Sequence, residues 1–122
     1  MTDLEVFTEE FTIWQKILGL TGYQVYFKHM PIGDSFANIT ISQRDMVATA
    51  RLNSKLPSKD KPYLNIRASA RHEAIHLLLG RIAQRAIDRY VSEDEIFEAE
   101  EETVRRLESA LDQLDALREQ QA

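Results

Sequence analysis

Residues 72–76, His-Glu-Ala-Ile-His, constrain this chain more than any other stretch. They lie in an apolar run, residues 69–80, whose periodicity predicts a helix. Two histidines four residues apart share one helix face, so both imidazoles can reach one metal ion. Glu73 lies on a neighbouring part of that surface, from which it can reach a metal-bound water without being a ligand. The pattern therefore predicts a catalytic metal site on a central, mostly buried helix.

The same five residues also fit a buried helix whose two histidines are satisfied by hydrogen bonds. A suitable third ligand would favour the metal site over the buried helix, because a catalytic zinc ion takes three protein ligands and keeps one position for water. Leu79 and Ile82 occupy the positions at which a longer zinc motif would carry glycine and histidine. The remaining histidine, His29, lies far upstream on a predicted strand. The third ligand is therefore expected to be a carboxylate.

Length and composition set the class of protein. A chain of 122 residues predicts a single domain, residues 1–122, and the lack of cysteine excludes disulfides and thiolate zinc sites. Residues 1–91 carry 12 basic and 9 acidic side chains, and residues 92–122 carry 3 and 11. No basic patch stands out, so we expect no nucleic acid partner. With no signal peptide and no apolar run long enough to span a bilayer, we expect a cytoplasmic protein without a membrane anchor.

Apolar patterning predicts an α+β fold. An amphipathic helix is expected over residues 3–20, followed by strands at 23–30, 36–42 and 46–53. These strands predict a small, largely antiparallel sheet. An irregular loop, residues 54–64, precedes the helix that carries the two histidines.

The histidine helix is expected to begin between Asn65 and Ala70 and to run towards Tyr90. Ser92 and Glu95 form a capping-box pattern, which predicts a third helix that extends to about Arg118. A short turn between the two helices predicts that they pack antiparallel.

Two adjacent glutamates of the third helix are the candidates for the third ligand. Glu100 lies 40° from Val104 around the helix axis, and Glu101 lies 60° from it on the other side. Glu98 and Glu102 point more towards solvent. A glutamate on an apolar stripe is costly to bury unless it meets a cation, either a metal ion or an arginine such as Arg71 or Arg81. A hairpin that turns near Val91 would place residues 102–106 level with His76, unless the histidine helix ends early, near Gly80 or Gln84.

Residues 71–80, Arg-His-Glu-Ala-Ile-His-Leu-Leu-Leu-Gly, and residues 100–108, Glu-Glu-Glu-Thr-Val-Arg-Arg-Leu-Glu, together resemble a known family. They are similar to the small zincin-like metallopeptidases found in phage and bacterial genomes, whose pattern is H-E-x-x-H-x-x-L followed by E-E-x-x-V-x-R-L. These proteins resemble minimal gluzincins and, more distantly, the ImmA/IrrE and SprT-like families.

The resemblance implies a minimal zincin-like fold and a zinc-dependent peptidase that acts on a peptide or protein substrate. His72 and His76 would then be zinc ligands and Glu73 the general base. Glu101 is the favoured third ligand, with Glu100 as the alternate and Glu102 beside them. A substrate peptide would pair with an exposed sheet edge, for which strand 46–53 is a candidate.

An oxyanion donor is expected to accompany these residues, and Tyr63, Tyr90 and Arg71 are candidates. Two other interpretations of the chain stay open: a non-catalytic zinc-binding structural or protein-interaction module, and a metal-free α+β adaptor. A fourth protein ligand such as His29 would favour the closed, structural type of zinc site.

Overall fold

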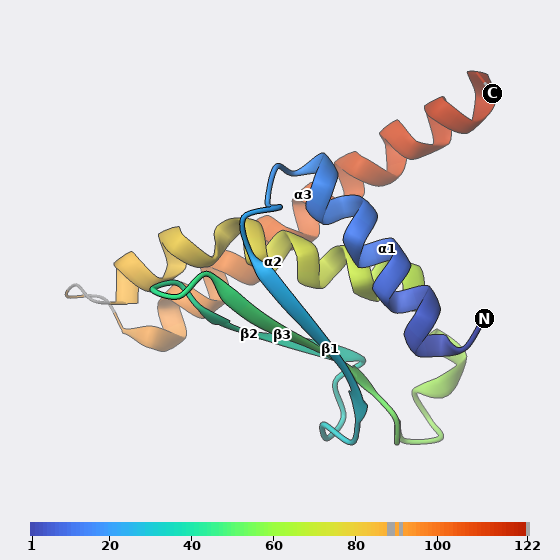
Figure 1. The fold of residues 1–122 in the computed structure, drawn as a ribbon, viewed down its shortest axis with the longest axis horizontal. Helices are drawn as coiled ribbons and strands as arrows, with labels where there is room; N and C mark the ends of the chain where they lie inside the picture. Colours follow the sequence, from blue (N-terminus) through green and yellow to red (C-terminus); the bar gives the residue numbers. More distant parts are fainter. Residues whose placement is uncertain (88–89, 91, 122) are drawn as a thin grey trace. The chain divides into compact units, whose positions relative to one another are not determined.

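The computed structural model describes residues 1–87, 90 and 92–121, without the side chains of residues 85, 102, 103, 106 and 109. The chain divides into two compact units, residues 1–81 and residues 82–122. Figure 1 shows the helices and strands in chain order. The first unit holds a helix, three strands, a short 3-10 helix and most of a second helix, and the second unit holds a third helix. This order of elements confirms the predicted α+β class. Among the described residues, no helix is long and apolar enough to cross a membrane.

Helix α1 (Asp3–Ile17) opens the first unit with a capping box. Thr2 Oγ1 accepts the Glu5 N–H at 3.1 Å, and the Glu5 carboxylate accepts in return from the Thr2 backbone. The helix ends three residues earlier than predicted. Gly19 takes a φ of 71°, a left-handed conformation that is easy for glycine and ends a helix.

Three strands follow, and each lies within one residue of its prediction: β1 (Gln24–Met30), β2 (Ala37–Ser42) and β3 (Val47–Asn53). Their order in the sheet is β1-β3-β2. β3 pairs with β2 antiparallel and with β1 parallel. The prediction of a largely antiparallel sheet was therefore wrong in this detail, because β1 and β2 do not form a hairpin and the sheet is mixed.

Asn53, at the end of β3, binds the connection that leads from β1 to β2. Its Nδ2 donates to the carbonyls of Gly33 and Ser35 at 2.8 Å each, and its Oδ1 accepts the Lys55 N–H at 2.9 Å. The connection between Met30 and Ala37 is thus tied across the end of β3. Its six residues reach easily across two strand spacings, roughly 10 Å, so β3 lies between the other two strands.

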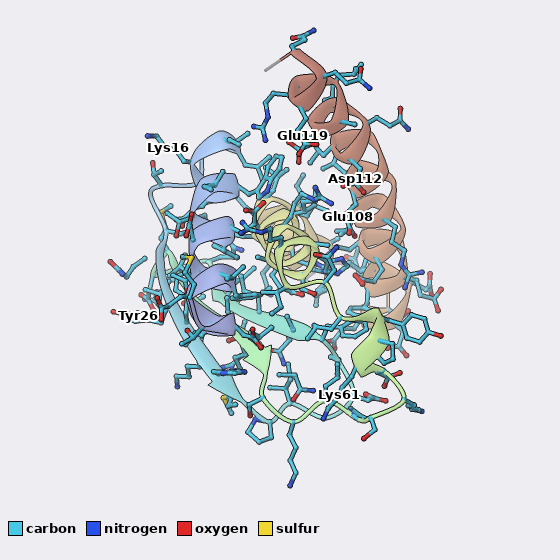
Figure 2. The ribbon with its side chains drawn as sticks, turned by 90° about the vertical axis from the view of Figure 1, so that its right-hand side faces the viewer. Lys16, Tyr26, Lys61, Glu108, Asp112 and Glu119 are labelled. Carbon is cyan, nitrogen blue, oxygen red and sulfur yellow. The ribbon has the colours of Figure 1, made fainter. Side chains whose placement is uncertain are left out.

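Aromatic and small side chains fill the space between the sheet and the helices. Phe27 of β1 meets Phe7 and Phe11 of α1 edge to face, with ring centroids 6.2 and 5.3 Å apart. In β3, Ala48 and Ala50 are buried on that same face. Tyr26, on the other face of β1, is 54% exposed (Figure 2). One face of the sheet therefore packs against helices, as the alternation in the sequence predicts.

A loop with a short 3-10 helix, η1 (Lys61–Tyr63), leads into helix α2 (Ile66–Ile87). Asn65 Oδ1 accepts the Ala68 N–H at 3.0 Å and caps the first turn of α2, within the predicted range for its start. The described part of α2 continues without interruption past Gly80 and Gln84 to Ile87. An early end of this helix is therefore ruled out, and the predicted continuation towards Tyr90 lies partly outside the described residues.

Helix α3 (Glu93–Gln121) makes up most of the second unit. The predicted helix start at Ser92 is confirmed, because Ser92 Oγ accepts the Glu95 N–H at 3.2 Å and donates to the Glu95 carboxylate at 2.9 Å. The helix extends three residues beyond the predicted Arg118.

Candidate metal centre

The two histidines of α2 point their ring nitrogens at one place. His72 Nε2 and His76 Nε2 lie 3.2 Å apart, and the ring centroids are separated by 4.9 Å at an interplanar angle of 64°. Both side chains are partly buried. One helical turn therefore brings the two imidazoles together from a rigid scaffold.

This spacing can be tested against the geometry of a metal ion. Two nitrogens that each lie 2.0–2.1 Å from a tetrahedral zinc ion are separated by about 3.3 Å. The distance between the two Nε2 atoms, 3.2 Å, fits that requirement. It also fits an N–H···N hydrogen bond between the rings, so the pair is arranged for a metal ion without requiring one.

Glu73 lies beside the first histidine and is only 5% exposed. Glutamate is seldom buried to this extent. One residue along a helix is a rotation of about 100°, so the carboxylate leaves α2 on a different side from the imidazoles. Its place suits a residue that acts next to a metal ion rather than one that binds it.

In the second unit, Glu100 and Glu101 are both partly buried on α3. His72 and His76 each offer a ring nitrogen to a metal ion, and Glu101 offers a carboxylate oxygen. The side chain of Glu102 lies outside the described residues. Among the residues that the structure describes, His29 does not belong to this group, and it is exposed at the end of β1.

The three candidate oxyanion donors have different surroundings. Tyr63 is 75% exposed and Tyr90 is fully exposed. Arg71 is buried, with its guanidinium carbon 5.6 Å from the centroid of the Trp14 ring. Arg71 therefore packs against α1, a contact that the sequence analysis did not predict. Local sequence patterns carry no signal for this contact, because it joins side chains of two different helices.

Strand β3 cannot be the edge that receives a substrate peptide. It lies between β1 and β2 and pairs with both. The prediction that strand 46–53 is an exposed edge was therefore wrong, and the edges of this sheet belong to β1 and β2.

Comparison with known proteins gives a distant likeness to a solved structure. No family model and no curated protein matches the chain. Among solved structures, the fold is similar to the crystal structure of the metallopeptidase zymogen of Methanocaldococcus jannaschii jannalysin. The identity is 17%, the match covers 83% of this chain and 89% of that chain, and the TM-score is 0.40. A likeness of this size assigns neither a family nor an activity to this chain.

Proposed function

We propose that this protein is a zinc-dependent peptidase in which His72, His76 and Glu101 bind the ion and Glu73 is the general base. The observation that carries the proposal is the pair of imidazole nitrogens 3.2 Å apart with a buried carboxylate on the adjoining residue. Imidazole and carboxylate are ligands that zinc accepts, and three protein ligands leave one position for water.

Each residue has a distinct part in the proposed reaction. When bound, zinc lowers the pKa of a coordinated water to about 7 and polarises the peptide carbonyl. The two histidines and Glu101 hold the ion at a fixed place relative to Glu73. Glu73 takes a proton from the attacking water and passes it to the leaving amine, so the peptide bond is hydrolysed without a covalent intermediate.

The substitution Glu73→Gln tests the proposed base directly. Wild type and variant, each loaded with one equivalent of zinc, are incubated with a diverse peptide mixture, and products are quantified by mass spectrometry. We expect equal zinc affinity and a loss of hydrolysis of about 10²–10⁴-fold, the usual contribution of a general base. The matched control is Glu98→Gln, which changes an exposed glutamate of α3.

Two results would contradict the proposal. If Glu73→Gln cleaves as well as wild type, Glu73 is not the base. If zinc-loaded wild type cleaves no peptide in the mixture, the protein is instead the non-catalytic zinc-binding module.

A further inference from the structure

Four side chains join α1 to the first turns of α2, and we call them the arginine clamp: Glu10, Trp14, Arg67 and Arg71. The Glu10 carboxylate accepts from Trp14 Nε1 at 3.1 Å through one oxygen and from Arg67 at 3.2 Å through the other. The Arg71 guanidinium lies over the Trp14 ring, 5.6 Å from its centroid. Both helices contribute residues four apart, so the contact runs along one face of each.

The inner half of the clamp is buried. Trp14 is 6% exposed and Arg71 is 8% exposed. A planar guanidinium held against an aromatic face has few orientations open to it, especially where water is excluded. Arg71 directly precedes His72, so the clamp ends one residue before the first candidate ligand.

On its opposite side, α2 approaches β2 and the turn that follows it closely. A Cβ atom added to Gly80 would lie closer to Gln43 Nε2 than van der Waals contact allows. It would also lie 3.0 Å from Ile41 Cδ1. Gly80 follows Arg71 by nine residues, which corresponds to about half a turn around the helix axis. His72 and His76 lie between these two points along the chain.

Rotation of α2 about its axis matters for any ion that the histidines bind. A ring nitrogen about 6 Å from the axis moves by roughly 1 Å for each 10° of rotation. A functional site tolerates about 0.5 Å of displacement. The contacts that fix this rotation therefore affect metal affinity without touching the ion.

We propose that Trp14 is a positioning residue for the metal centre. By holding Arg71 it fixes the rotation of α2, and so the direction in which His72 and His76 present their nitrogens. The inference rests on the proposed function, because it presumes that these histidines bind a metal ion.

The test compares two buried aromatic residues of α1. Trp14→Leu removes the face under Arg71 and the bond to Glu10, whereas Phe11→Leu removes a fully buried ring that packs on Phe27. Zinc dissociation constants are measured by chelator competition, and the stability of the metal-free proteins by urea unfolding. We expect both variants to lose stability. Only Trp14→Leu should weaken zinc binding, by about tenfold, the lower end of the effect of an outer-shell partner.

Further variants keep the test decisive if Trp14→Leu does not fold. Trp14→Phe retains an aromatic face under Arg71 and should bind zinc within about threefold of wild type. Arg71→Lys keeps the charge but not the planar group, and should weaken zinc about tenfold.

The possible failures can be told apart. Equal zinc affinity in Trp14→Leu and Phe11→Leu, or wild-type affinity in Arg71→Lys, overturns the positioning role alone. A wild-type protein that binds no zinc overturns the proposed function and this inference together.

Discussion

At the scale of single residues, the candidate metal centre depends on the spacing of His72 and His76. The sequence predicts this pairing because four residues of an α-helix bring two side chains to one face. The distance between the two ring nitrogens and the burial of Glu73 could not be predicted from the sequence. In the structure the Nε2 atoms lie 3.2 Å apart, and Glu73 next to them is buried. Arg71, which the sequence offers as an oxyanion donor or an ion-pair partner, is buried and lies over the Trp14 ring.

The identity of the third ligand is tested by alanine substitution in α3. Glu101→Ala should weaken zinc binding by more than the roughly 10–100-fold that loss of an outer-shell partner causes, because it removes a carboxylate that contacts the ion. Glu98→Ala, at an exposed position of the same helix, should leave the affinity unchanged. Isothermal titration with zinc gives both values. A larger loss in Glu100→Ala than in Glu101→Ala would assign the ligand to Glu100.

At the scale of elements, Gly80 allows α2 to approach the turn between β2 and β3. Tyr23 donates its hydroxyl proton to Gln43 Oε1 at 2.6 Å, so the Gln43 side chain beside Gly80 is held in place. Gly80→Ala gains about 0.5–1 kcal/mol of helix propensity. It also displaces Gln43 and crowds Ile41, which costs about 1–3 kcal/mol. We expect net destabilisation in urea unfolding.

The same substitution in a Gln43→Ala background separates the two effects. Without the Gln43 side chain, most of the crowding at Gly80 is removed, and Gly80→Ala should be about 1 kcal/mol less costly than in wild type. Additive effects of the two substitutions would show that Gln43 does not press on α2 at this position.

Asn53 sets the order of the strands, and its removal should be costly. Asn53→Ala deletes two hydrogen bonds that tie the connection between β1 and β2 across the end of β3, and a third that Asn53 accepts from the Lys55 N–H. At about 1 kcal/mol for each bond, we expect a loss of about 3 kcal/mol in urea unfolding. Asn38→Ala, which removes one bond to Arg51, should cost about 1 kcal/mol or less. Equal losses in the two variants would contradict this role of Asn53.

The elements themselves were largely predictable, whereas their arrangement in the sheet was not. Alternation and turn residues placed each strand within one residue, the start of α2 fell within the range predicted from Asn65 to Ala70, and the pattern at Ser92 predicted where α3 begins. Strand order depends on contacts such as those of Asn53 with Gly33 and Ser35, which are distant from it in the sequence. Local patterns carry no information about such contacts, so the parallel pairing of β1 with β3 was missed.

At the scale of the whole molecule, the chain consists of two units, and each contributes candidate ligands. His72 and His76 belong to the first unit, and Glu101 belongs to the second. The antiparallel packing of the α2 and α3 helices stays a prediction, as does the assignment of zinc. Because the ligands of a metal site are rarely preformed in the unfolded chain, metal binding and folding should be linked in this protein.

The central claim is that the chain binds one zinc ion through His72 and His76, and elemental analysis by mass spectrometry tests it most directly. Protein purified without chelators and then dialysed against buffered zinc should contain about one zinc per chain. The double variant His72→Ala/His76→Ala should contain less than about a tenth of that amount, because one carboxylate cannot hold zinc alone. Wild type that contains no zinc, or a double variant that retains as much zinc as wild type, would contradict the account.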